Sequence, residues 1–96
     1  MNLREDIERQ IIFLAKEFNL ERVILFGSRA RGDNRERSDI DLALEGEIAA
    51  CIEFSLAAEE NISTLLMFDF VLVDENLSAE LRAAIEKEGV VLYEKV

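Results

Sequence analysis

Two aspartates separated by one residue, Asp39 and Asp41, are the strongest candidates for chemistry in the sequence. Residues two apart on a β-strand project from the same face, and twice the strand rise places their Cα atoms roughly 6.6 Å apart. Both carboxylates can therefore converge on one point, where a cation would relieve their mutual repulsion. Two metal ions about 3.5–4 Å apart are the usual arrangement for in-line phosphoryl transfer. Because the chain has 21 acidic residues, such a pair also arises readily by chance.

A glycine and a serine, Gly27 and Ser28, separate a short apolar run from an arginine-rich one. A strand that ends in such a turn can present backbone N–H groups to a phosphate. Arg29 and Arg31 follow directly and can pair with anionic oxygens. The alternative is an ordinary turn at the end of a strand, with both arginines solvated.

A third aspartate, Asp69, interrupts the apolar run over residues 65–71. A charge inside such a strand costs free energy unless it is paired or bound to a metal ion. If this strand lies beside the strand of Asp39 and Asp41, Asp69 completes a cluster of three carboxylates. The alternatives are that Asp69 is a solvated residue at a strand end, or that Asp74 takes its place.

Missing residues exclude several mechanisms. The chain has no histidine, which excludes a histidine base or metal ligand, and its single cysteine, Cys51, leaves no basis for a structural zinc site. Gly27 and Gly32 have the spacing of the glycines of a P-loop, but the lysine that must follow is absent. Carboxylates are thus the only abundant group for metal chemistry, and they suit hard cations such as Mg²⁺.

Length and charge suggest the organisation of the chain and the class of its ligand. Its 96 residues are enough for a single domain, residues 1–96, and no stretch is long and apolar enough for a membrane span. A charged N-terminus and a lone cysteine favour a cytoplasmic protein. The net charge of −10 argues against binding long nucleic acid, while five arginines lie within residues 22–37. We therefore expect a small anionic ligand.

The hydrophobic periodicity predicts alternating helices and strands. Helices are expected over residues 3–18, 47–60 and 77–88, with Gly89 ending the last one, and strands over residues 23–26, 39–44, 65–73 and 90–93. Residues 29–38 form a turn, with room for one short helical stretch. This order predicts an α+β fold, or two-layer α/β fold, in which helices pack on a small mixed β-sheet.

The motifs occur together in an order that resembles the signature of the polymerase-β-like nucleotidyltransferases. They read G-S-R-A-R-G over residues 27–32 and S-D-I-D-L over residues 38–42, and residues 68–93 resemble the family's C-terminal half. More narrowly, the chain is similar to the minimal nucleotidyltransferases, many of which are antitoxins of HEPN/MNT toxin–antitoxin pairs. Residues 46–64 depart most from the family pattern, which leaves the partner surface open.

The resemblance implies a role for each candidate residue. Asp39 and Asp41 would ligate two Mg²⁺ ions, and Asp69 would complete the metal site and help to deprotonate the acceptor hydroxyl. Gly27 and Ser28 would bind the triphosphate, with Arg29 supporting it. The implied reaction is transfer of AMP from ATP to a hydroxyl, a tyrosine of the HEPN toxin in some members of the family, which silences the toxin.

Three functions follow as hypotheses. The first is an antitoxin that acts as a protein adenylyltransferase, in a hetero-oligomer with the toxin or as a homo-oligomer. The second is a binding module that neutralises the toxin by masking it, without catalysis. The third is a nucleotidyltransferase for RNA or a small molecule, and the charge of −10 weighs against RNA. The intact Gly-Ser pair and all three aspartates favour the first hypothesis, the protein adenylyltransferase. Since 96 residues leave no room for a further domain that binds a template, we expect a partner protein to supply the acceptor.

Overall fold

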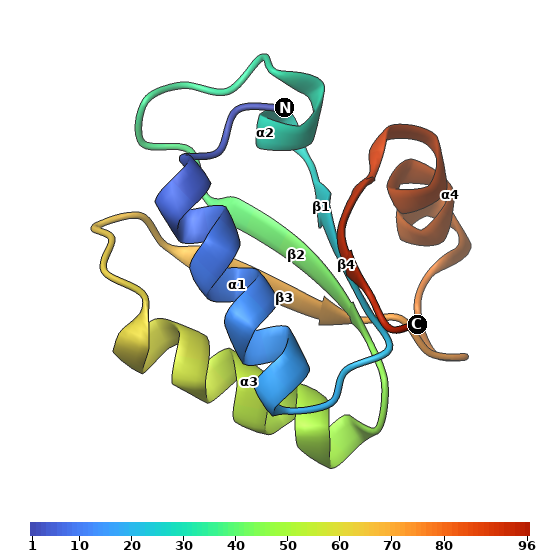
Figure 1. Ribbon diagram of the computed structural model, residues 1–96. Helices are drawn as coiled ribbons and strands as arrows, with labels where there is room; N and C mark the ends of the chain where they lie inside the picture. The colour runs from blue at the N-terminus through green and yellow to red at the C-terminus, as the bar shows by residue number, and fades with distance from the viewer.

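A four-stranded mixed sheet with helices on both faces forms the fold of the computed structural model, which describes residues 1–96 (Figure 1). In chain order the elements are α1 (Glu5–Glu17), β1 (Arg22–Phe26), α2 (Ser28–Arg31), β2 (Ile40–Glu45), α3 (Ile48–Asn61), β3 (Phe68–Leu72), α4 (Ala79–Glu88) and β4 (Val90–Glu94). This arrangement confirms the predicted α+β class, including the short helical stretch after Gly27.

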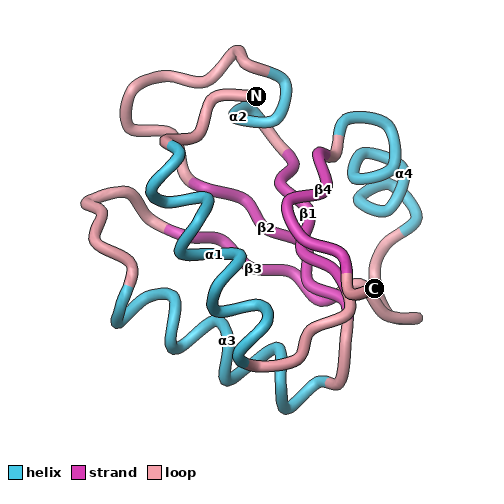
Figure 2. The backbone as a smooth tube through the Cα atoms, viewed as in Figure 1, coloured by secondary structure: helices cyan, strands magenta, loops and turns pink.

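The strand order β3-β2-β1-β4 places the two motif-bearing strands side by side at the centre of the sheet. β1 runs antiparallel to both of its neighbours, whereas β2 and β3 are parallel. Parallel neighbours need a long crossover connection, and α3 supplies it. Figure 2 shows this β2–α3–β3 unit, with α3 lying across the strands that it connects.

One face of the sheet is covered by α1 and α3, and we call it the closed face (Figure 1). Alternate residues of each strand point into it, as the period-two pattern requires. Sixteen buried residues form its core, including Ile7 and Ile11 of α1, Val23 and Leu25 of β1, Ile40, Leu42 and Leu44 of β2, and Cys51, Phe54 and Ala58 of α3. Most of the buried apolar surface of the chain therefore lies on this side.

The opposite face, which we call the open face, is covered only in part. A smaller cluster of four buried residues, Ile24, Phe26, Ala43 and Ile85, joins β1 and β2 to α4. Other positions on this face, including Asp41 and the residues of β3 that point to it, are only half-buried or exposed. The candidate residues on β2 and β3 therefore stand on the less covered side of the sheet.

The helix predicted over residues 47–60 is correct, but the residues that predicted it lie on its outer side. Ile48, Ile52 and Leu56, spaced four apart, are each at least 50% exposed. Cys51, Phe54 and Ala58 make the contact with the sheet instead. Since α3 is apolar on both sides, its periodicity does not reveal which side packs inward.

The strand predicted over residues 65–73 is shorter in the structure. β3 begins at Phe68, and the preceding Leu65 is fully exposed. Gly89 ends α4 as predicted, but with an ordinary φ of −66°. A Cβ at this position would meet the Ile85 carbonyl and lie 2.6 Å from Cγ2 of Ile24, so close approach to β1 requires the glycine. No helix has the length and apolar character needed to cross a bilayer.

Candidate active site

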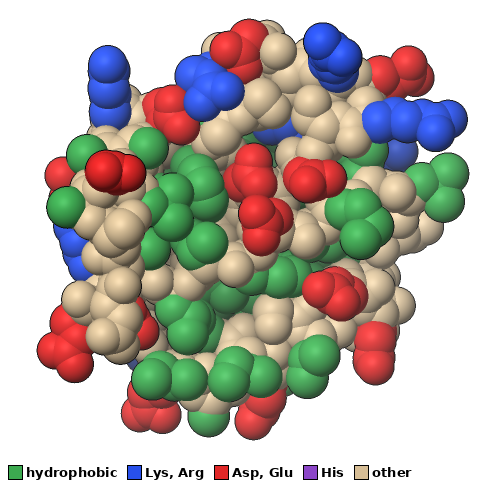
Figure 3. Space-filling model, turned by 180° about the vertical axis from the view of Figure 1, so that it is seen from behind, with side chains coloured by type: hydrophobic (Ala, Val, Ile, Leu, Met, Phe, Trp, Pro, Cys, Tyr) green, Lys and Arg blue, Asp and Glu red, His purple; other side chains and the backbone are tan.

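The three predicted aspartates stand on the open face, from two neighbouring strands. Asp41 lies in β2 and is paired in parallel register with Asp69 of β3, while Asp39 lies one residue before β2. Ile40 and Leu42 point into the closed face, so Asp39 and Asp41 point away from it. Figure 3 views the molecule from this side and shows a group of carboxylates near the middle of the face. The structure thus brings together residues 28 positions apart in sequence.

The carboxylates repel one another. Burial raises the pKa of Asp41 above its ordinary value, and the charges of Asp69 and Asp39 raise this pKa further. The nearby Arg31 opposes the rise and lowers the pKa of Asp41. None of the three aspartates takes part in an ion pair, since all six ion pairs of the chain lie elsewhere. The face therefore carries negative charge that the chain itself does not neutralise.

This donor set fits a hard divalent cation. Three carboxylates without an internal counter-charge are oxygen donors of the kind that Mg²⁺ prefers. As their side chains lie, no three of the acidic or thiol groups converge closely enough to hold a metal ion. Like charges keep such groups apart when no cation lies between them. Asp39, Asp41 and Asp69 are the residues that would hold it.

The Asp41 carboxylate packs directly against Gly27. Its φ of 75° lies in the left-handed region, which side chains rarely adopt. A Cβ at this position would collide with Oδ2 of Asp41, because β1 and β2 pair so that Phe26 stands opposite Asp41. Glycine is therefore required twice over, by the backbone conformation and by the space that the carboxylate occupies. This explains why the glycine and the aspartate belong to one motif.

Ser28 begins α2 at the edge of the open face. The first N–H groups of a helix have no carbonyl partners within it, so this turn presents donors to an anion. The Ser28 carbonyl accepts from the N–H groups of Gly32 and Asp33, which fixes the turn. Ser28 therefore directly follows the glycine that packs against the Asp41 carboxylate.

Arg29 differs from the expectation that it contacts a ligand. Its side chain is only 6% exposed. The guanidinium donates from Nε to the carbonyl of Ser38 (3.0 Å), from Nη1 to that of Asn2 (3.1 Å) and from Nη2 to that of Glu36 (3.0 Å). These bonds direct the side chain away from the open face, so Arg29 is a positioning residue rather than one that touches phosphate.

The contact between Arg29 and Ser38 bears directly on Asp39. The loop between α2 and β2 spans residues 32–39, and Ser38 is the last residue before the first aspartate. The Ser38 hydroxyl accepts from the backbone N–H of Arg35 (2.8 Å), and the Ser38 N–H donates to the Arg35 carbonyl (3.1 Å). A tight turn and a buried guanidinium together fix the backbone from which Asp39 projects.

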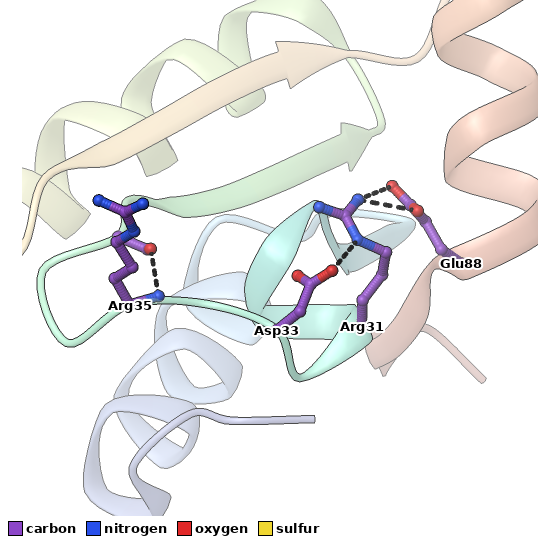
Figure 4. Close-up of polar contacts among 5 residues, drawn as sticks. Arg31, Asp33, Arg35 and Glu88 are labelled. Atoms are coloured by element: carbon purple, nitrogen blue, oxygen red, sulfur yellow. Dashed lines mark hydrogen bonds and ion pairs between the residues drawn. The ribbon is translucent and has the colours of Figure 1, made fainter.

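Arg31 is the arginine that faces the site. Its Nε donates to Asp33 (3.1 Å), and its Nη1 lies 3.0 Å and 3.1 Å from the two carboxylate oxygens of Glu88 (Figure 4). The side chain is 45% exposed and lies near enough to Asp41 to lower its pKa. Residues two apart on a helix point in roughly opposite directions, so 29 and 31 cannot both face the ligand. The sequence predicts that both Arg29 and Arg31 can pair with an anion, and in the structure only Arg31 is exposed.

A comparison with protein families decides the class. Residues 8–96 match the family described as "Polymerase beta, Nucleotidyltransferase". The chain belongs to this family. The aspartates on the open face and the Gly27-Ser28 turn all lie within the matched residues. A relative in Methanocaldococcus jannaschii, named as a candidate protein adenylyltransferase, is 28% identical over 97% of this chain and 100% of its own length.

Solved structures share the fold of this nucleotidyltransferase. A chain in the crystal structure of a toxin–antitoxin with AMP-PNP superposes with a TM-score of 0.67, at 26% identity over 92% of this chain and 73% of that chain. The structure of a candidate minimal nucleotidyltransferase has a TM-score of 0.67 at 29% identity, over 86% of each chain. The predicted polymerase-β-like core is confirmed.

Proposed function

We propose that this nucleotidyltransferase is a Mg²⁺-dependent protein adenylyltransferase, which transfers AMP from ATP to a hydroxyl of a HEPN-family toxin and so acts as its antitoxin. The observation that carries the proposal is the open face itself, where Asp39, Asp41 and Asp69 form no ion pair and Asp41 packs against Gly27 with Arg31 nearby. The adenylyltransferase name of the relative and the toxin–antitoxin with AMP-PNP support the substrate and the partner.

Each residue of the face has a part in the transfer. Ser28 and the first N–H groups of α2 would donate hydrogen bonds to the triphosphate, and Arg31 would exchange a carboxylate partner for a phosphate oxygen. Asp39 and Asp41 would hold two Mg²⁺ ions. When bound, these ions neutralise the negative charge of the triphosphate and polarise it for attack.

The reaction is a displacement at the α-phosphorus. The acceptor oxygen forms a bond to the α-phosphorus while the bridge to the β-phosphate breaks, and pyrophosphate leaves with the electron pair. Asp69 would take the proton from the acceptor hydroxyl, because β3 is an edge strand that an acceptor can approach from outside the sheet. A tyrosine of the partner is the proposed acceptor.

Intact-mass spectrometry tests the proposal. The chain is mixed with a HEPN-family protein from the same genome, ATP and Mg²⁺, and this protein is expected to gain one or more AMP units. Asp39→Asn combined with Asp41→Asn should lower the rate at least about 100-fold, since it removes both ligands of the metal pair. Asp74→Asn is the matched control, because Asp74 lies beyond β3 in a turn and its carboxylate accepts from the Asn76 N–H (2.9 Å).

The alternatives give different results in the same assay. A double variant that neutralises the toxin fully, with no mass gain in either protein, would favour masking over catalysis. Incorporation of labelled AMP into RNA or a small molecule, with none in the partner, would favour the third hypothesis. Equal activity of the double variant and the Asp74→Asn control would contradict the assignment of the site.

A further inference from the structure

One side of α3 exposes large apolar side chains to solvent. Ile48, Ile52 and Leu56 are 58%, 50% and 58% exposed, and their spacing of four places them in one stripe along the helix. A helix that is apolar all round is typical of the interior of a protein. Here the inner side meets the sheet, while the outer side meets nothing in the chain.

A groove continues this stripe toward the sheet edge. It has a volume of about 190 Å³ and lies between α3, which contributes Ile52 and Ser55, and β3, which contributes Phe70, Val71 and Leu72. β3 is the last strand of the sheet on this side, so its outer edge has unpaired backbone groups. We call the stripe and the groove together the α3–β3 surface.

Most of the charge on and beside the α3–β3 surface is negative, and the nearest basic side chain on α1 is Arg9. Between Arg37 and Arg82 the chain has no lysine or arginine, and this stretch contains eleven acidic residues. Those on or next to α3 are Glu47, Glu53, Glu59 and Glu60. In Figure 3 most of the visible basic side chains lie along the top, while apolar and acidic side chains border the lower part, where α3 runs. The surface is an apolar band with an acidic border.

That border decides the kind of partner. A second copy of the chain would bring the same carboxylates against this border, and like charges across an interface cost several kcal/mol. Nucleic acid and anionic membranes carry the same sign and are repelled as well. A protein surface that joins an apolar ridge to lysine or arginine complements both features.

We propose that the α3–β3 surface docks a partner protein through an amphipathic helix whose apolar face is flanked by lysines or arginines. The acidic border steers this helix, and the apolar stripe and groove hold it. Asp69 lies one to three residues before the groove residues of β3, or within roughly 10 Å along the strand. Its side chain stands on the open face whereas α3 covers the closed face, so the partner must extend around the edge strand β3 to reach it. The inference deepens the proposed function and rests on it in one respect only, that the docked partner also supplies the acceptor.

Binding of two designed peptides tests the proposal without ATP or transfer. Each has about 20 residues, long enough to form a helix, and both share one apolar face. One carries lysines on both flanks of that face, and the other carries glutamates. Calorimetric titration of the full chain should give binding of the lysine peptide, at least about tenfold tighter than that of the glutamate peptide.

Two pairs of variants locate the binding. Ile52→Ser with Leu56→Ser should weaken the lysine peptide at least about tenfold, whereas Val91→Ser, at a similarly exposed apolar position on β4, should not. Glu53→Lys with Glu60→Lys should weaken binding of the lysine peptide by a similar factor. Glu80→Lys with Glu86→Lys on α4, which changes the net charge equally, should have a much smaller effect. All these side chains are exposed, so thermal unfolding should confirm that the variants fold.

Several results would overturn the docking proposal. One is the absence of binding by the lysine peptide, and another is an equal loss in the variants and their controls, which indicates general charge attraction. A dimer in sedimentation that Ile52→Ser with Leu56→Ser dissociates would assign the surface to a second copy. These measurements are independent of AMP transfer, so a failed transfer assay does not affect them, and the reverse holds as well.

Discussion

The closed and open faces of one sheet divide the tasks of the molecule. Sixteen residues form the core of the closed face, whereas four form the core of the open face. The closed face has no charged group in its core, while the open face holds three carboxylates that repel one another. The difference indicates that burial under α1 and α3 offsets the free energy that the charged face costs.

The largest expected effect tests the closed face. Phe54 of α3 is fully buried there, and Phe54→Ala should lower the free energy of unfolding by about 3–5 kcal/mol because it leaves a cavity. That is a large part of the total for a domain of this size. Val71→Ala, at a half-buried position of β3 toward the open face, should cost much less. Urea denaturation measures both, and similar losses would contradict the division between the faces.

A second, smaller effect concerns Arg29, whose guanidinium holds the backbone just before Asp39. Arg29→Met should lower stability by roughly 2–3 kcal/mol, since three backbone carbonyls lose a charged donor. It should also slow AMP transfer, because the backbone before Asp39 loses its anchor. Arg31→Met is the matched change at an exposed site and should reduce transfer with little change in stability. If the two variants had the same effect on stability, Arg29 would not be a positioning residue.

Comparing substitutions at Gly27 and Gly32 distinguishes the effect of backbone strain from the effect of displacing the Asp41 side chain. Gly27→Ala should cost about 1–3 kcal/mol and abolish most activity, because it combines a φ of +75° with a collision with Asp41. Gly32→Ala has a similar φ of +88° but open space around its Cβ, so we expect a loss of about 1 kcal/mol and retained activity. Thermal unfolding and transfer rates measure the difference. Full activity of Gly27→Ala would show that catalysis does not depend on the packing of the Asp41 carboxylate against Gly27.

The smallest effect is a gain in stability from removing a site residue. The pKa of Asp41 is raised in the folded chain. The free energy of unfolding therefore falls as pH rises from the unfolded-state pKa, near 3.8, through the higher folded-state pKa. Above this window Asp41→Asn should therefore be more stable than the parent chain, by up to about 1 kcal/mol in low salt. Below it the difference should vanish. Denaturation at both pH values, without metal, measures it, and a variant that is less stable at neutral pH would contradict the repulsion.

Much of the fold and the motif side of the site follows from the sequence. Alternation over residues 39–44 predicts β2 and places Asp39 and Asp41 on one face, and a charge within an apolar run singles out Asp69. Their meeting depends on the parallel pairing of β2 with β3, which the periodicity of either strand alone does not contain. The resemblance of the motifs supplied this pairing, and the register of Asp41 with Asp69 agrees with it.

Other features depend on tertiary contacts that no local pattern specifies. The stripe Ile48, Ile52 and Leu56 has the spacing of a buried face, yet the sheet meets Phe54 and its neighbours instead. Arg29 and Arg31 have the same side chain, and only the rotation of α2 relative to the sheet makes one a buried anchor and the other exposed. The spacing of two along a helix guarantees that they differ, but not which of them faces inward.

The Arg29 anchor also has a practical consequence for handling the protein. The backbone of Asn2 is bonded to Arg29 in both directions, by its N–H to the Arg29 carbonyl (2.8 Å) and by its carbonyl to the guanidinium. An affinity tag fused to Met1 begins one residue from this contact and crowds the loop that carries Asp39. Val96 at the other end is fully exposed, so purification and surface immobilisation are best done through a tag placed there.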